Sequence, residues 1–216
     1  MDFPMLAVLD PEDRARLLAD LRRREFGRNE VIVHEGDPAD SMHLIAKGRV
    51  LVTLMNPNAE RVDVAILGPG KCFGELSMLS RPERRTSMIT ALEPTETLVL
   101  PRDQLDRLRR RYPAIDRLIA ELLAEQVRRL GNELLNVLFV PAHRRVMRRI
   151  VDLCTEFGDG TTPTEIPLSQ KTLSGLAGTT RPTVNQVLQE LVAKNQIKLA
   201  RGRIIVCDLD GLRRRA

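Results

Sequence analysis

Short apolar runs separated by turn-forming residues fill much of the chain between positions 26 and 100. The runs predicted as strands cover residues 31–34, 42–45, 50–54, 62–67 and 97–100. Gly, Pro, Asn and Asp residues stand between them, as in the stretch 56–58, which is typical of strands joined by tight turns. Strands do not alternate with long helical patterns, so the sequence argues against a doubly wound parallel sheet. The pattern predicts an antiparallel β-roll of the jelly-roll type.

Helical patterns flank this strand region on both sides. Asp10 followed by Pro11 predicts the start of a short helix, with Asp10 as its N-cap. Residues 102–111 predict a short basic helix. Residues 113–140 predict a much longer helix, which begins at a proline and contains no other Gly or Pro except Gly131. Such a helix would extend about 42 Å, which is more than a small domain requires.

The long helix carries an apolar seam with alternating spacings of four and three residues. The seam consists of Leu123, Val127, Leu130, Leu134 and Val137. Such a seam is typical of two helices that pack side by side in parallel, and the alternative is that it packs on the β-roll. A separate apolar face, available to the β-roll, is formed by Ile115, Leu118, Ile119 and Leu122. The presence of both faces favours a helix that joins two copies of the chain.

The last third of the chain predicts a pair of helices joined by a tight turn and followed by a hairpin. Pro141 ends the long helix, residues 142–157 predict another helix, and residues 158–163 predict a loop. Ser169 suits the N-cap of a helix that continues to about residue 177, and Gly178 supplies the turn.

A second helix follows the turn at Gly178. It opens at Thr180, with Pro182 in its first turn. The apolar positions that would lock these two helices together are Leu173, Ala177, Val184, Val187 and Leu188. Residues 197–206 then alternate as a β-hairpin with a basic turn. This order of elements is that of a winged helix-turn-helix.

The charge distribution favours a polyanion as partner of this last third. The chain has 216 residues and a formal net charge of +5. Residues 1–137 hold 21 basic and 22 acidic residues, a balance of −1, whereas residues 138–216 hold 13 basic and 7 acidic residues, a balance of +6. A solvated basic surface is the alternative explanation. Together with the helix-turn-helix pattern, the local charge predicts binding to double-stranded DNA.

In a helix-turn-helix, the N-terminal residues of the second helix reach base edges in the major groove. Arg181 suits a bidentate contact with guanine, and Gln186 suits adenine or another base edge. The residues better placed for phosphates, which set register, are Ser169, Gln170, Thr180 and Thr183. For Arg181, an ion pair on a solvated helix face is the alternative.

Composition argues against several other classes of protein. Charged residues make up 29% of the chain and no run of 18 apolar residues occurs, so no membrane span is expected. The first residues lack a basic segment followed by an apolar one, so no signal peptide is expected. Three scattered cysteines, Cys72, Cys154 and Cys207, argue against a disulfide framework or a clustered metal site and fit a reducing cytoplasm. Aromatic residues amount to only 3%, which argues against stacking on single-stranded bases.

No enzyme is predicted. Gly-x-Ser-x-Gly and Walker patterns are absent from the sequence, and no nucleophile stands in a recognisable arrangement with a base. The three histidines are not grouped, so neither a catalytic nor a metal site is expected. Two of them, His34 and His43, fall in predicted strands and are expected at turns or on the surface.

A second candidate site lies between the last two predicted strands. Gly74-Glu75-Leu76 at a strand-to-helix turn can present backbone N–H groups to an anion, and a carboxylate there can accept hydrogen bonds from sugar hydroxyls. Ten residues after Glu75, Arg85 and Thr86 combine a guanidinium with a hydroxyl, which suits a phosphate. From spacing alone, an ion pair between Glu75 and Arg85 is an alternative.

Together these residues resemble the bacterial CRP/FNR superfamily of transcription regulators. The similarity covers nearly the whole chain and includes Gly36, Gly48, Gly70, Gly74, residues 73–87, the long helix and residues 168–206. It implies an α+β chain with three parts. Residues 1–112 would be a cyclic-nucleotide-binding-like β-roll sensor domain, residues 113–140 a long dimerisation helix, and residues 141–216 a winged helix-turn-helix DNA-binding domain.

The resemblance also implies partners and residue roles. A homodimer would bind a near-palindromic DNA site under control of a small nucleotide effector, with RNA polymerase as a further partner and no membrane. Glu75 would accept from the ribose 2′-hydroxyl, Arg85 would hold the cyclic phosphate, and Thr86 would contribute its hydroxyl. Gly74 and Leu76 would make backbone contacts.

Two departures from the family pattern affect specificity. Members that respond to cyclic AMP place small polar residues on the long helix to receive the purine, whereas Arg128 and Arg129 stand at those positions here. As ligand-binding candidates, the two arginines would face a second phosphate of a larger nucleotide. The alternative is that they pair with Glu121, Glu125 or Glu133. Cyclic AMP is the expected effector. The alternative is a constitutive regulator, or one whose β-roll binds another nucleotide such as cyclic di-GMP. In the second helix, Pro182 and Gln186 replace a frequent Glu and Arg, so the DNA half-site is expected to differ.

The scattered cysteines and histidines disfavour other branches of the superfamily. The iron–sulfur members carry an N-terminal cysteine cluster that this chain lacks, and the haem members need axial ligands for which only three histidines are available. No cofactor is expected besides the effector.

Overall fold

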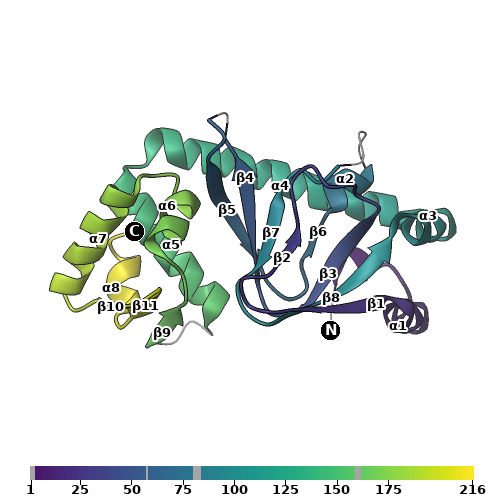
Figure 1. Cartoon of the computed structure of the whole chain (residues 1–216), viewed down its shortest axis with the longest axis horizontal. Helices are drawn as coiled ribbons and strands as arrows, with labels where there is room; N and C mark the ends of the chain where they lie inside the picture. Colours follow the sequence, from purple (N-terminus) through teal and green to yellow (C-terminus); the bar gives the residue numbers. More distant parts are fainter. Residues whose placement is uncertain (1–2, 57, 80–83, 159–161) are drawn as a thin grey trace. The chain divides into compact units, whose positions relative to one another are not determined.

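The computed structural model describes residues 3–56, 58–79, 84–158 and 162–216. The predicted turn at 56–58, the segment 73–87 and the predicted loop at 158–163 therefore lie partly outside the described residues. The chain forms two compact units, Met1–Arg128 and Arg129–Ala216, which divide within the long helix. Antiparallel sheets, a long helix and a C-terminal helix-turn-helix make the fold an α+β fold, as the sequence predicted (Figure 1).

The first unit contains two four-stranded antiparallel sheets. The first sheet has the order β1(Arg22–Phe26), β8(Thr95–Pro101), β3(Ser41–Lys47), β6(Cys72–Phe73). The second has the order β2(Val31–Val33), β7(Met88–Ala91), β4(Val50–Met55), β5(Arg61–Leu67). All five strands predicted from apolar runs are present.

In the first unit, the sequence analysis missed three of the described strands: β1, β6 and β7. Strand β1 is an edge strand that pairs only with β8, and four of its five residues are exposed. It consists mostly of arginines, so it lacks the apolar run on which the strand prediction depended. Its strand conformation is decided by the backbone hydrogen bonds that β8 offers.

The helices of the first unit cover one face of the first sheet. They are the 3-10 helix η1(Pro4–Leu6), α1(Pro11–Asp20), α2(Glu75–Leu79), α3(Arg102–Arg111) and the N-terminal part of α4(Ala114–Phe139). The predicted cap of α1 is confirmed, because the Asp10 carboxylate accepts a hydrogen bond from the backbone N–H of Asp13 at 2.9 Å. Helices α1 and α3 lie at the same end of the unit, where Arg111 and Asp13 form a 3.1 Å ion pair (Figure 1).

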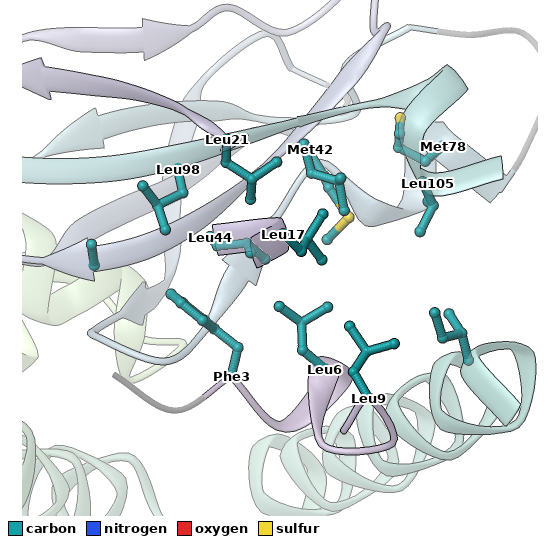
Figure 2. Packing of buried hydrophobic residues seen from close by; sticks show 13 residues of the cluster. Phe3, Leu6, Leu9, Leu17, Leu21, Met42, Leu44, Met78, Leu98 and Leu105 are labelled. Carbon is teal, nitrogen blue, oxygen red and sulfur yellow. The ribbon is translucent and has the colours of Figure 1, made fainter. Parts of the chain in front are cut away.

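One hydrophobic core joins these helices to the sheet. Figure 2 shows the side chains of Phe3 and Leu6 facing those of Leu17 and Leu44. The other buried members of this core include Met42, Leu100, Leu105 and Ile115. Each fully buried side chain of this size contributes about 1.5–3 kcal/mol, so this cluster holds the helices in place on the sheet.

A second core lies on the other face of β3 and joins strands of both sheets. Its members include Phe26, Ile45, Val50, Phe73 and Ile89. Strand β3 is therefore buried on both faces, with five consecutive buried residues. For this reason the prediction that His43 lies at a turn or on the surface was wrong. His43 is 3% exposed and stacks on Phe73 with ring centroids 4.8 Å apart.

The second unit contains the end of α4 and the remaining elements. These are α5(Ala142–Phe157), β9(Thr164–Ile166), α6(Gln170–Leu176), α7(Arg181–Ala193), β10(Ile197–Ala200), β11(Arg203–Val206) and α8(Leu209–Arg213). The predicted helix pair and hairpin are confirmed. The sequence analysis missed β9, which extends the hairpin to a three-stranded sheet of order β10-β11-β9, and the short helix α8.

Candidate functional site

Gly74 and Arg85, eleven residues apart in the sequence, are in contact in the first unit. Gly74 has a φ of +86°, and a Cβ atom built on it would collide with Nη1 of Arg85. The same Cβ would also lie 3.2 Å from the carbonyl oxygen of Ser41. Both the backbone conformation and the space therefore require glycine at this position.

Arg85 is held from both its backbone and its side chain. Its N–H donates to the carbonyl of Asp37, and its own carbonyl accepts from Gly36, each at 2.8 Å. Its Nη1 donates to the carbonyl oxygen of Ser41 at 2.6 Å, and its Nη2 donates to the Ser41 hydroxyl at 3.3 Å. With only 6% of its surface exposed, Arg85 is one of the most buried charged residues described.

The Arg85 guanidinium lies in a partly desolvated environment. Burial lowers the pKa of the Arg85 guanidinium, while the carboxylates of Asp40 and Asp37 raise it. Arginine has so high an intrinsic pKa that it stays charged in proteins. A buried guanidinium beside an open glycine backbone is a suitable place for a phosphate.

Glu75 begins α2 directly after Gly74. Burial raises the pKa of its carboxyl group, so the side chain lies in a poorly solvated environment. The structure, which describes both residues, contains no ion pair between Glu75 and Arg85. The alternative of a simple ion pair is therefore not what the geometry shows. Burial, followed by the neighbouring Glu75 charge, raises the pKa of the Cys72 thiol to about 12, so this thiol stays protonated.

The other residues predicted for the ligand are less closely gathered. Leu76 is 39% exposed and Thr86 is exposed. Arg128 lines a surface pocket of the first unit together with Leu118, Leu122, Glu121, Glu125 and Pro4, and no described contact joins it to Gly74 or Arg85. Arg129 belongs to the second unit and forms an ion pair with Glu133 at 3.3 Å, one helical turn away.

In the second unit, the predicted phosphate-contacting hydroxyls stand at two helix N-termini. The Ser169 hydroxyl caps α6 by accepting from the N–H of Thr172 at 3.1 Å. The Thr180 hydroxyl caps α7 by accepting from the N–H of Thr183 at 3.5 Å. In both places free backbone N–H groups and the helix dipole favour an anion.

The residues predicted to read base edges lie on the surface of α7. Arg181 and Gln186 are both exposed. Gln186 donates to the carboxylate of Glu190 at 3.5 Å, whereas the Arg181 side chain has no ion pair or hydrogen bond with any residue that the structure describes. The alternative, an ion pair of Arg181 on the helix face, is therefore not found among the described residues. Gln170 is half-buried at the start of α6.

Arg145 on α5, which the sequence analysis did not single out, connects two helix ends of the second unit. Its guanidinium donates to the carbonyls of Val137 and Val140 at the end of α4, at 3.1 and 2.8 Å. It also donates to Ala177 and Gly178 after α6, at 3.1 and 2.7 Å. Neither Arg145 nor Ser41 belongs to a sequence pattern. Arg145 donates to four backbone carbonyls, and the backbone carbonyl of Ser41 accepts from Arg85.

The predicted apolar seam of α4 is largely exposed in the single chain. Val127, Leu130, Leu134 and Val137 are 68%, 53%, 59% and 49% exposed. Of these four, Val127 lies in the same unit as the β-roll, and its exposure does not agree with the alternative that it packs there. Leu123 is half-buried.

Among the described residues, no helix is both long enough and apolar enough to span a bilayer. No group of three or more His, Cys, Asp or Glu side chains there is arranged to hold a metal ion. All three cysteines are free thiols.

Comparison with protein families assigns both units. A cyclic nucleotide-binding domain model matches residues 23–112, and a Crp-like helix-turn-helix domain model matches residues 144–215. The cyclic AMP receptor protein of Thermus thermophilus is 32% identical over 203 residues, which cover 94% of this chain and 92% of that protein. A CRP-like cAMP-activated global transcriptional regulator of Mycobacterium tuberculosis is 29% identical over 211 residues, covering 96% and 94%.

Solved structures agree with this assignment. The catabolite activator protein of Thermus thermophilus matches with a TM-score of 0.57 at 31% identity, covering 97% of this chain and 96% of that one. The c-di-GMP-responsive global regulator CLP of Xanthomonas campestris matches with a TM-score of 0.78 at 20% identity, covering 92% and 99%. At that identity, the second match shows the fold alone.

Proposed function

The chain belongs to the CRP family of transcription regulators, and we propose that it is a homodimeric regulator that binds near-palindromic DNA in response to cyclic AMP. It has a cyclic nucleotide-binding domain and a Crp-like helix-turn-helix, and it is a regulator rather than an enzyme. The proposed division has the sensor at residues 1–112, the dimer helix at 113–140 and the DNA reader at 141–216. Such a regulator would act in the cytoplasm, with RNA polymerase as its protein partner.

The observation that carries the effector proposal is the buried guanidinium of Arg85 beside Gly74. A cyclic phosphate would replace lost hydration with charge-assisted hydrogen bonds, which are stronger than neutral ones. Glu75, at the start of α2, would accept from the ribose hydroxyl, and Leu76 and Thr86 would complete the contacts. Two relatives are named for cyclic AMP, which supports this nucleotide as effector.

We assign base recognition to the N-terminal half of α7. Arg181 is free to contact guanine and Gln186 reaches a further base edge, while Ser169, Gln170, Thr180 and Thr183 would contact phosphates. The basic balance of the last part of the chain supports this role.

Dimerisation is assigned to the exposed seam of α4. Soluble chains rarely leave a contiguous row of apolar side chains in water, and the spacings of four and three suit a parallel helix pair. Two readers related by a twofold axis would then meet half-sites about 34–36 Å apart. A ligand regulates such a dimer only if it binds one of its conformations more tightly.

Calorimetric titration tests the effector. We expect cyclic AMP to bind wild-type protein, and Arg85→Ala to weaken binding roughly 10- to 100-fold, because hydrogen bonds to a charged group are lost. Lys71→Ala is the matched control, since it removes an exposed positive charge from the same unit. Absence of binding up to millimolar cyclic AMP would refute this effector.

A second candidate is a regulator whose β-roll does not respond to cyclic AMP. The ion pair of Arg129 with Glu133, and the arginine at position 128, favour it because the resemblance expects small polar residues there. The two candidates are distinguished by the affinity of the purified protein for DNA that it has selected from a random pool, measured with and without nucleotides. Affinity that is identical with and without cyclic AMP, cyclic GMP and cyclic di-GMP supports constitutive binding, and a response to cyclic di-GMP alone identifies that effector.

A further inference from the structure

The guanidinium of Arg85 rests on a single residue of β3, Ser41. The Ser41 carbonyl accepts from Nη1 at 2.6 Å, and the Ser41 hydroxyl accepts from Nη2 at 3.3 Å. A guanidinium has five N–H groups, so these two bonds fix its plane and leave the other three for a ligand. Ser41 lies outside the segment 73–87 that the sequence pattern marked.

Asp40 determines the direction in which the Ser41 hydroxyl points. The hydroxyl donates its one proton to Oδ1 of Asp40 at 3.1 Å. A guanidinium has no acceptor, so the hydroxyl can only accept from Arg85, and with its proton directed at Asp40 a lone pair is left for Nη2. The Asp40 carboxylate also stabilises the charged guanidinium, which counters the effect of burial.

Ser41 also touches the other side of the site. Its carbonyl oxygen would lie 3.2 Å from a Cβ at Gly74, so Gly74, Ser41 and Arg85 are mutually in contact. The guanidinium cannot swing toward Gly74 without meeting backbone, nor away from it without losing both bonds to Ser41. The contacts with Ser41 and Gly74 therefore hold the guanidinium in this position.

We propose that Ser41, oriented by Asp40, is a positioning residue that holds Arg85 ready for the phosphate of a nucleotide. The inference rests on the proposed function and adds to it two residues that set affinity without touching the base or the ribose. A preorganised guanidinium loses less side-chain freedom on binding, so the ligand binds more tightly than it would to a mobile arginine.

Calorimetry with cyclic AMP on a double-mutant cycle tests the proposal. We expect Ser41→Ala to weaken binding about 5- to 10-fold, and Ser41→Thr, which keeps a hydroxyl, to restore most of it. In an Arg85→Ala background, Ser41→Ala should have no further effect. The matched control is Thr90→Ala, which removes a half-buried hydroxyl from β7 outside the segment 73–87 and should bind as wild type does.

Two results would overturn the positioning role. One is unchanged cyclic AMP binding in Ser41→Ala. The other is an equal loss in the wild-type and Arg85→Ala backgrounds, since that would mean Ser41 acts independently of Arg85.

A ligand-free measurement separates this inference from the proposed function. If wild type binds no cyclic AMP, the proposed effector fails, and the same four proteins are compared by urea unfolding without ligand. Non-additive effects of the two substitutions on unfolding support the contact between Ser41 and Arg85, whereas additive effects refute it.

Discussion

The guanidinium of Arg145 donates a hydrogen bond to the carbonyl oxygen of Gly178 at 2.7 Å. The same side chain reaches the carbonyls at the end of α4, so one cation serves the C-terminal ends of two helices. Helix C-termini carry unsatisfied carbonyls and a partial negative charge, and both are compensated by arginine. The last turn of α4 is thereby joined to the turn that precedes α7, within the second unit.

Replacement of Arg145 by alanine is expected to destabilise the second unit by about 2–3 kcal/mol, because four carbonyls lose a charged donor. Urea unfolding followed by circular dichroism measures this change. Arg144→Ala is the control, since Arg144 is the exposed neighbour on the same helix. Equal unfolding midpoints for the two variants would contradict the capping role.

Two glycines should respond in opposite ways to alanine. Gly74→Ala is expected to lower stability by about 1–3 kcal/mol and to abolish nucleotide binding, because its φ is +86° and the new Cβ would displace Arg85. Gly131→Ala should raise stability by about 1 kcal/mol, since Gly131 lies inside α4 with open space around its Cβ position. Thermal unfolding of both variants checks the pair. A Gly74→Ala variant more stable than wild type would show that the contact between Gly74 and Arg85 is wrongly assigned.

His43 should make stability depend on pH. Its burial lowers its pKa from 6.5 to about 4, so the fold favours the neutral ring, whose Nδ1 lies 3.0 Å from the Thr97 hydroxyl. The neutral His43 ring makes its full contribution to the free energy of unfolding above pH 6.5. This contribution is lost as the pH falls toward 4, at up to about 1.4 kcal/mol per pH unit.

Urea unfolding from pH 7.5 to 4.5 compares His43→Gln, which cannot ionise, with wild type. In His43→Gln the free energy of unfolding should fall less steeply with decreasing pH than in wild type. His34→Gln, at an exposed position, should keep the pH dependence of wild type. Parallel pH profiles for wild type and His43→Gln would show that the ring is not desolvated.

A charge in the seam of α4 should break the proposed dimer. Leu134→Lys places an ammonium at a 59% exposed seam position, where two copies of it would meet across the interface. We expect a monomer by light scattering after gel filtration, with weaker DNA binding. Leu122→Lys, on the separate apolar face, should remain dimeric. A wild-type protein that is already monomeric at micromolar concentration would refute the assignment.

Arg181→Ala should relax DNA specificity at one base pair of each half-site. A bidentate contact with guanine is worth about 1–3 kcal/mol of discrimination, so affinity for the selected site should fall while binding to random DNA changes little. Competition binding on the selected site and on single-base variants measures both. Lys171→Ala, at an exposed position on α6, should weaken binding to all sequences alike if it meets phosphate.

Local features of the chain could be predicted because their causes are local. Asp10, Ser169 and Thr180 cap helices through their own nearby N–H groups, and Gly178 turns the chain through its own positive φ of +56°. The charge balance and the α7 surface residues could be read in the same way, since exposed side chains on a helix need no distant partner.

The sequence by itself thus determined most of the helices, the strands with apolar runs, the winged helix-turn-helix and the choice of Gly74, Glu75 and Arg85 as candidate site residues. Only the tertiary structure decided which residues support them. Strand β1 exists because β8 offers hydrogen bonds, and His43 is buried because both faces of β3 are covered. Ser41 reaches Arg85 across 44 positions and Arg145 reaches Gly178 across 33. These contacts leave no periodic pattern in the sequence, because they join a side chain to atoms of a distant backbone, and only folding brings the two together.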